Sequence, residues 1–394
     1  MDFTKLTTYL DSLRDTYGVP MSDLKVMKDH EVLFRYRFGH ADFAGKKPLT
    51  EQHLYRLYSA TKLITMTAVL QLVEAGKLKL EDRLSTYLPE YETVMAADDF
   101  DLISYGNRVG NVPVHPAKNP ITIRQLMSMS AGFSYDTQDP NIRALAESSK
   151  GEAGTREIIA ALSKTPLLYE PGTRWCYSLA HDVLAAVVEV ISKQTFSAYL
   201  KEHLFEPLGA HDFYFHPEED PEVLNRVCDI YTGVDDKPPF EAAPKSHWNA
   251  YCFTKNYESG GAGLTGSVDA YSLITDALAC GGIGKSGKRI LKSETVAMFH
   301  EPVTTTGQLH RDFAELNRIG YEYGLGVRVL VDNAHSKSPV GEFGWDGAAG
   351  AYALVDTQNA LSMFYAGHVL SFSDHYHVIH PKIRDLVYEA VDLA

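Results

Sequence analysis

Residues 54–80 read LYRLYSATKLITMTAVLQLVEAGKLKL and place a serine, Ser59, three residues before a lysine, Lys62. Apolar side chains then recur with the spacing of a helix, and Gly76 stands where a C-terminal helix cap is expected. A second side of the same helix is also apolar. The segment therefore predicts a buried helix that carries Ser59 and Lys62 at its N-terminal end.

The serine and lysine suggest a nucleophile with its base. A serine hydroxyl is a weak nucleophile until a neighbouring base takes its proton, and residues three apart share one helix face. The same spacing recurs at Ser22 and Lys25, which lead into a predicted strand. A serine at a helix N-terminus can also serve only as a cap. The pair by itself leaves a catalytic and a structural role open.

Patterns on either side of this segment indicate how the chain is organised. Helix signals lie at residues 3–17, 259–278 and 381–391. Strand signals lie at residues 24–42, 323–332, 347–356 and 360–368. The sequence between them is mostly helical and is interrupted by proline-rich loops. We predict an α+β fold in which residues 1–85 and 257–394 form one antiparallel sheet flanked by helices, and residues 86–256 form a mostly helical domain.

Composition narrows the class of function. The chain has 394 residues, 45% of them hydrophobic, which suffices for a proper globular core. Its net charge of -14 argues against binding to nucleic acid or to an anionic membrane. A small-molecule or protein partner is therefore expected, and the sequence leaves the oligomeric state open.

Targeting signals and cysteines bear on location. The first residues carry acids and no apolar core of signal-peptide length, and no later apolar run reaches the length of a membrane span. The four cysteines lie far apart with no Cys-x-x-Cys spacing, which predicts reduced thiols. These features together predict a cytoplasmic protein.

Two further segments supply groups that acyl-transfer chemistry requires. Residues 171–191 contain Tyr177, and a phenol near a lysine ammonium can take the serine proton and return it to a leaving group. The glycines around Trp345 and Asp346 let a strand backbone approach a substrate closely, as an oxyanion hole requires. Each signal is weak alone, since tyrosines commonly pack at helix ends and strand glycines commonly mark bulges. Their joint occurrence favours a serine hydrolase.

With these motifs the sequence resembles the serine β-lactamase and penicillin-binding-protein superfamily, and within it the class C-like branch that includes the family VIII carboxylesterases. The resemblance runs from about Leu24 to the C-terminus. It rests on the segments YSATKLITMTAVLQLVEAGKLKLEDRLSTYLPEY, ITIRQLMSMSAGF, PGTRWCYSLAHDVLAAVVE and SGGAGLTGSVDAY. The resemblance implies a bacterial enzyme that works through an acyl-enzyme without a metal or an organic cofactor.

The resemblance also implies roles for individual residues. Ser59 would be the acylated nucleophile, Lys62 its partner, and Tyr177 the general base and acid. The backbone N–H groups of Ser59 and Ala348 would form the oxyanion hole. Residues 345–347, Trp-Asp-Gly, fall where many relatives carry Lys-Thr-Gly or His-x-Gly, so that Trp345 and Gly347 would contact the substrate.

Two departures from the β-lactam-processing relatives bear on the substrate. Those relatives use the lysine of the third motif to bind a substrate carboxylate, and an asparagine often stands two residues after the tyrosine. Trp345 and Leu179 occupy these positions, and an indole offers one N–H and no charge. We therefore expect hydrolysis of small, mostly neutral esters. A β-lactamase, a D-Ala-D-Ala peptidase-like enzyme and a transacylase remain alternatives.

Other classes are less well supported. A Ser-His-Asp hydrolase is less well supported because the sequence contains no Gly-x-Ser-x-Gly motif. A metal could be sought at Asp374, His375, His377 and His380, but their spacing matches no common zinc motif and a polar loop before the last helix explains them equally well. A binding protein without catalysis is disfavoured because the serine, the lysine and the tyrosine are all present.

Overall fold

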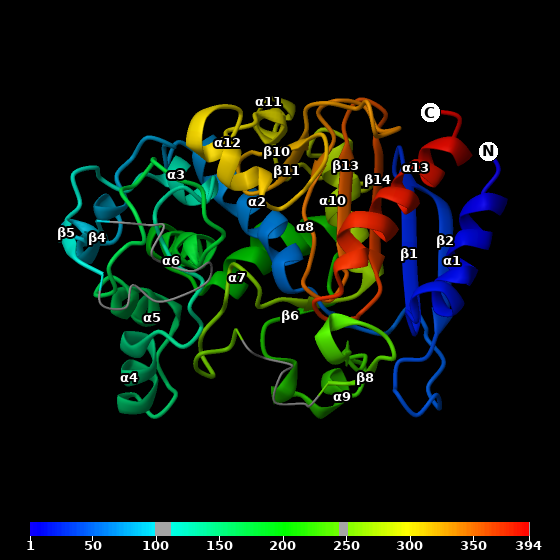
Figure 1. Cartoon of the computed structure of the whole chain (residues 1–394), viewed down its shortest axis with the longest axis horizontal. Helices are drawn as coiled ribbons and strands as arrows, with labels where there is room; N and C mark the ends of the chain where they lie inside the picture. Colours follow the sequence, from blue (N-terminus) through cyan, green and yellow to red (C-terminus); the bar gives the residue numbers. More distant parts are fainter. Residues whose placement is uncertain (99–111, 244–250, 394) are drawn as a thin grey trace.

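A computed structural model describes residues 1–98, 112–243 and 251–393 (Figure 1). Its centre is a seven-stranded antiparallel sheet with the order β10-β11-β12-β13-β14-β1-β2. β1 joins the two ends of the chain, because it pairs with β2 on one side and with β14 on the other. The strands are β1 (Met21–Lys28), β2 (Glu31–Gly39), β10 (Tyr321–Tyr323), β11 (Arg328–Leu330), β12 (Phe343–Gly344), β13 (Tyr352–Asp356) and β14 (Leu361–Ala366).

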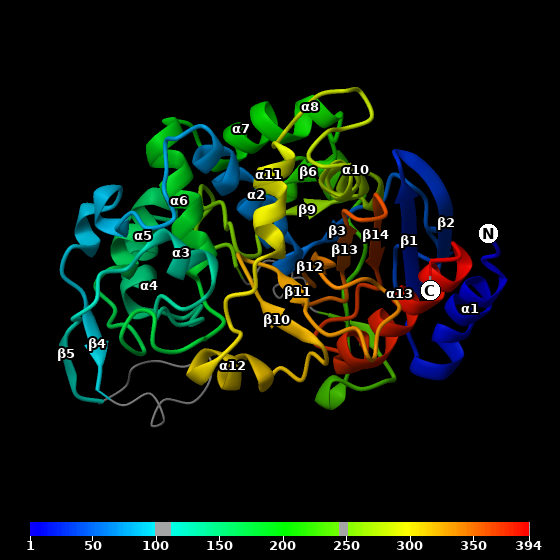
Figure 2. The same cartoon turned by 90° about the horizontal axis from the view of Figure 1, so that it is seen from above.

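This architecture confirms the predicted fold. The β1–β2 turn forms at Asp29 and His30, which both have positive φ values, as two-residue hairpin turns that match strand twist require. All residues of β13 and β14 are buried, because helices cover both faces of the sheet. Figure 2 shows α1 (Thr4–Tyr17) and α13 (His380–Ala390) on one side of the sheet and α10 (Val268–Ala279) on the other.

The predicted buried helix is α2 (Thr61–Glu74), which a 3-10 turn, η1 (Tyr58–Ala60), introduces. Nearly all of its residues are buried, since it packs against α6 (Ala180–Ser192) on the side away from the sheet. Figure 1 shows α2 between the sheet and the helices of the middle of the chain. The residues at its N-terminal end therefore lie where these two parts of the molecule meet.

The middle of the chain is mostly helical, as predicted, and a capping box at Thr122 and Gln125 opens α3. Its division from the sheet as a separate domain stays a prediction. The other helices are α3 (Ile123–Met127), α4 (Pro140–Ser148), α5 (Thr155–Leu162), α7 (Phe196–Leu200), α8 (Glu206–Leu208), α9 (Pro221–Leu224), α11 (Ser293–Val296) and α12 (Gly307–Ala314).

Short strands complete the structure. A small sheet with the order β3-β9-β6 lies beside the N-terminal end of α2, and two further strand pairs, β4-β5 and β7-β8, lie elsewhere. Their bounds are β3 (Tyr55–Arg56), β4 (Met95–Ala97), β5 (Val114–Pro116), β6 (Phe213–Tyr214), β7 (Tyr231–Thr232), β8 (Glu241–Ala242) and β9 (Thr265–Gly266). No single helix among the described residues has both the length and the hydropathy to cross a membrane; α6 and residues 196–208 meet both criteria only as a pair bent by 76°.

Candidate active site

Ser59 lies in the tight turn between β3 and α2. The backbone N–H of Leu57 donates to the carbonyl of Leu264, which fixes this turn to the segment before β9. Tyr58, directly before the serine, has a φ of 47°, a conformation that residues with a Cβ rarely adopt. Strained backbone of this kind collects at functional sites, and here it presents a half-buried Ser59 at the start of a helix.

Lys62 is fully buried and lies beside the serine. Its Nζ is 3.4 Å from Ser59 Oγ and donates a 2.8 Å hydrogen bond to the carbonyl of Gly261. Burial lowers the pKa of Lys62 to about 7, although the carboxylate of Asp182 acts in the opposite direction. An amine with this pKa is unprotonated in a large fraction of molecules at neutral pH, and in that form it can accept a proton.

Asp182 holds the segment that contacts Lys62. Its buried carboxylate accepts hydrogen bonds of 2.7 Å from the Tyr257 hydroxyl and 2.5 Å from the Ser259 hydroxyl. A Cβ added to Gly261 would lie 2.5 Å from Asp182 Oδ2, so glycine is needed for this close approach. Gly261 belongs to the motif SGGAGLTGSVDAY, which by itself does not indicate a contact with the lysine.

Tyr177 lies against both Lys62 and Trp345. The lysine Nζ is 4.5 Å from the centroid of the tyrosine ring, and the Trp345 indole N–H donates a 3.1 Å hydrogen bond to the Tyr177 hydroxyl. The two aromatic rings are stacked, with centroids 5.8 Å apart. Trp345 is itself buried, so this contact fixes the direction of the Tyr177 hydroxyl.

A second tyrosine, Tyr135, was not predicted. Its hydroxyl lies beside the Ser59 side chain, and its ring centroid is 5.5 Å from Lys62 Nζ. Burial raises the pKa of Tyr135 well above its usual value, so the hydroxyl keeps its proton. Tyr135 follows the segment ITIRQLMSMSAGF by two residues, and this proximity to a family motif was the available signal.

The glycine-rich segment after β12 closes the site. A Cβ added to Gly347 would lie 2.2 Å from the carbonyl oxygen of Leu57. The backbone at Gly347 therefore touches the turn that carries Ser59, here called the nucleophile turn. Tyr376, from a π-helical turn before α13, donates a 3.1 Å hydrogen bond to the Gly347 carbonyl. A cleft of about 200 Å³ results, and its lining includes Ser59, Tyr177, Leu316, Arg318, Trp345, Asp346, Gly347, Ala348 and Tyr376.

Replacement of Gly347 by alanine should impair catalysis strongly. The added methyl group has no room beside the Leu57 carbonyl, so the strand or the nucleophile turn must move. We expect kcat/KM for a short p-nitrophenyl ester to fall by roughly a hundredfold, since about 1 Å of misplacement has this effect on reacting groups. Alanine at Gly154, where φ is -87° and a Cβ would come no closer than 4.0 Å to its neighbours, is the control and should keep its activity. Equal rates for both variants would contradict the placement of Gly347.

Asp346, between Trp345 and Gly347, has a structural role that the motif did not indicate. Its carboxylate lies 2.6 Å from the guanidinium of Arg318 and 3.2 Å from that of Arg328. Arg318 also lines the cleft. This arginine was not predicted, because it lies 27 residues before Trp345 in a loop without a motif.

The second Ser-x-x-Lys pair is structural. Ser22 and Lys25 both lie in β1, where residues three apart point to opposite faces of the sheet. The Ser22 hydroxyl is 3.2 Å from that of Tyr365, and Lys25 forms a 2.6 Å ion pair with Asp269. The sequence placed this pair at a strand and the pair of Ser59 and Lys62 at the start of a buried helix. The structure agrees with both placements.

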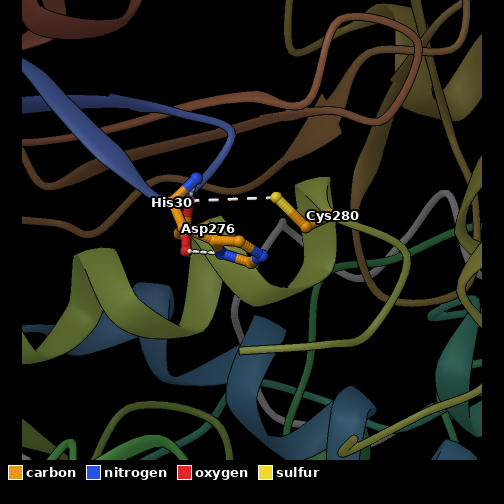
Figure 3. A group of neighbouring side chains, drawn as sticks. All are labelled: His30, Asp276 and Cys280. Carbon is orange, nitrogen blue, oxygen red and sulfur yellow. Dashed lines mark hydrogen bonds and ion pairs between the residues drawn. The ribbon is translucent and has the colours of Figure 1, made fainter. Parts of the chain in front are cut away.

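One group of possible metal ligands lies outside the cleft in the described parts of the chain. His30, from the β1–β2 turn, meets Asp276 and Cys280, from the end of α10 (Figure 3). Asp276 accepts hydrogen bonds from the backbone N–H of His30, at 3.2 Å, and from its ring, at 2.7 Å. Burial raises the pKa of the Cys280 thiol to about 11, which keeps it protonated. The group anchors the hairpin turn to α10.

The predicted polar loop at residues 374–380 is helical instead. A π-helical turn at His375–Ile379 leads directly into α13, because the segment packs against the sheet. His375 and His380 are buried and stack on one another, whereas His377 is exposed. Burial lowers the pKa of His375 to about 3, so its imidazole is neutral. The four side chains of this cluster are thus divided between core and surface.

Comparisons with known proteins were made over the whole chain. The beta-lactamase family model matches residues 6–379. Esterase EstB of Burkholderia gladioli is 30% identical over 86% of this chain and 83% of its own length. Acyltransferase calJ of Penicillium decumbens is 27% identical over 82% of this chain and 77% of its own. The crystal structure of a family VIII carboxylesterase superposes with a TM-score of 0.73 at 21% identity, covering 100% of this chain and 97% of the other.

Proposed function

Because this chain belongs to the beta-lactamase family, we propose that it is a serine hydrolase that cleaves small carboxylic esters through an acyl-enzyme. The resemblance that the motifs indicated is confirmed by the family match. Similarity to esterase EstB over most of both chains supports an esterase. We include a cytoplasmic location in the proposal, supported by four cysteines that form no disulfide within the described residues.

The contact between Lys62 and Ser59 carries the proposal. An amine with a pKa of about 7, 3.4 Å from a serine hydroxyl, meets the requirement for activation of a nucleophile by a base. We assign the first proton transfer to Lys62, because its Nζ contacts Ser59 Oγ directly. The same Nζ lies over the face of the Tyr177 ring. Tyr177 then acts on the leaving group, with its hydroxyl directed by Trp345.

The proposed cycle has two halves. Ser59 Oγ attacks the ester carbonyl carbon and passes its proton to Lys62, and the carbonyl oxygen becomes an oxyanion that the N–H groups of Ser59 and Ala348 bind. The bond to the alcohol then breaks, and the alcohol leaves with a proton from Tyr177, which Lys62 replenishes. Water attacks the acyl-serine in the same manner and releases the acid and free Ser59.

Acyl transfer is the second candidate function. An alcohol in place of water in the second half would give a new ester, and similarity to acyltransferase calJ favours this alternative. The two activities share the acyl-enzyme, so the products formed from one ester in the presence of a second alcohol distinguish them. Release of acid alone would identify a hydrolase.

The choice of ester over β-lactam is testable with two reporter substrates. Trp345 supplies no charge to bind the carboxylate of nitrocefin in the manner of a third-motif lysine. We expect kcat/KM for p-nitrophenyl butyrate to exceed that for nitrocefin by about tenfold or more, since the charge-assisted hydrogen bond that is missing at position 345 would contribute roughly 1.5–3 kcal/mol. Initial rates under identical conditions provide the comparison. A clear preference for nitrocefin would defeat the esterase proposal.

A further inference from the structure

The cleft continues past the reacting groups into a second cavity. Arg318 and Tyr376 line both the cleft that holds Ser59 and an adjoining cavity of about 160 Å³. The second cavity is lined by three arginines, three histidines and three tyrosines, together with Asn317, Ile319 and Pro381. The residues that line it include no aspartate or glutamate. Three arginines thus meet at one cavity of a chain whose net charge is -14.

The carboxylates around these arginines are shared. Asp346 lies between two guanidiniums, those of Arg318 and Arg328, so that one negative charge faces two positive ones. Arg328 has a second carboxylate, Glu342, at the longer distance of 3.5 Å. Arg318 has Asp346 as its only ion-pair partner among the described residues. Asp346 also lines the cleft, so Arg318 offers a ligand its remaining N–H donors rather than an excess of positive charge.

Arg318 is held in a fixed position with hydrogen-bond donors to spare. A guanidinium has five N–H donors, and Arg318 directs one amino group to Asp346 and the other to the backbone carbonyl of Tyr376, at 3.2 Å. The guanidinium also lies 4.9 Å from the centroid of the Tyr376 ring. An arginine fixed in this way loses little entropy when it binds a ligand.

We propose that Arg318 forms a carboxylate-binding subsite of the cleft, so that the preferred substrates are esters with a second, free carboxylate. The inference rests on the proposed esterase function and specifies its substrate class. A planar guanidinium binds a carboxylate through charge-assisted hydrogen bonds, and Ser59 and Arg318 line one small cleft, so the two groups of the substrate lie a few bonds apart. We expected neutral esters because Trp345 carries no charge. The fold, however, brings the guanidinium of Arg318 into the same cleft.

Matched pairs of acid and amide esters test this subsite. One pair, 3-acetoxybenzoate and 3-acetoxybenzamide, carries the group on the alcohol part; the other, monoethyl adipate and ethyl adipamate, carries it on the acyl part. We expect kcat/KM to favour the acid over the amide by about tenfold or more in at least one pair, as a charge-assisted hydrogen bond would produce. The preference should weaken as salt concentration rises.

Variants connect the preference to Arg318. The change Arg318→Gln should lower the acid-to-amide ratio of kcat/KM by about tenfold, and Arg318→Lys should retain part of it, because lysine keeps the charge but not the planar fork. The control Arg311→Gln alters an exposed arginine seven residues away, bonded to Gln308, and should leave the ratio as it is in the parent. The subsite would be overturned if Arg318→Gln left the acid-to-amide ratio of kcat/KM unchanged. It would also be overturned if the parent preferred the acid in neither pair.

The subsite and the esterase proposal fail in different ways. If the amide esters are hydrolysed by Ser59 and no acid preference exists, only the subsite is wrong. If no ester is hydrolysed, the esterase proposal is wrong, and titration calorimetry with 3-hydroxybenzoate and 3-hydroxybenzamide still tests the subsite. Tighter binding of the acid by the parent than by Arg318→Gln would support it, and equal binding would overturn it.

Discussion

Replacement of Ser59 by alanine should lower kcat/KM for p-nitrophenyl acetate by at least about a thousandfold, because the variant lacks the hydroxyl that the proposed cycle acylates. The substitution removes one half-buried hydroxyl, so the thermal unfolding temperature should change little. Initial rates and the intact mass of the protein after brief exposure to the ester provide two readouts. The parent should gain the mass of one acetyl group, and the variant should not.

The chain supplies its own control for this experiment. Ser22 has the same spacing to a lysine, but it lies in β1 beside Tyr365 and away from the cleft. Ser22→Ala should therefore keep its rate within about twofold and still acquire the acyl group. A substitution away from the cleft alters stability rather than chemistry. If Ser59→Ala retained more than about a tenth of the parent rate, the assignment of the nucleophile would be wrong.

The buried amine of Lys62 should determine the pH dependence of activity. Its neutral form accepts the proton of Ser59, so kcat/KM should rise with pH and level off above a pKa of about 7. Replacement by methionine should abolish this dependence and lower the rate by about a thousandfold or more. The matched control Lys25→Met, in the second Ser-x-x-Lys pair, should keep the profile of the parent.

Lys62 should also make folding stability depend on pH. Burial lowers the pKa from 10.5 to about 7, so between these values the unfolded chain binds a proton that the folded protein does not. Stability of the parent relative to Lys62→Met should therefore rise with pH across this window, by roughly 1.4 kcal/mol per pH unit. Urea denaturation of both proteins at pH 7 and pH 9.5 measures the difference. A constant difference would show that the amine keeps its ordinary pKa in the folded protein.

Features that neighbouring residues specify were predicted well. The α2 helix and the strands near both ends of the chain follow from periodicity and turn residues, which act over a few positions. The segment 374–380 was predicted wrongly, because its polar composition outweighed the contacts that two of its histidines make in the core. Local pattern cannot register such a contact.

The sequence by itself determined the family, the fold and three residues with the chemistry of a serine hydrolase. Only the tertiary structure brought Trp345 to the Tyr177 hydroxyl, enclosed Lys62 so that its pKa falls, and placed Arg318 in the wall of the cleft. These features depend on burial and on contacts between segments far apart in the chain. Desolvation and charge pairing arise when such segments pack together, so no periodicity or spacing in the sequence records them.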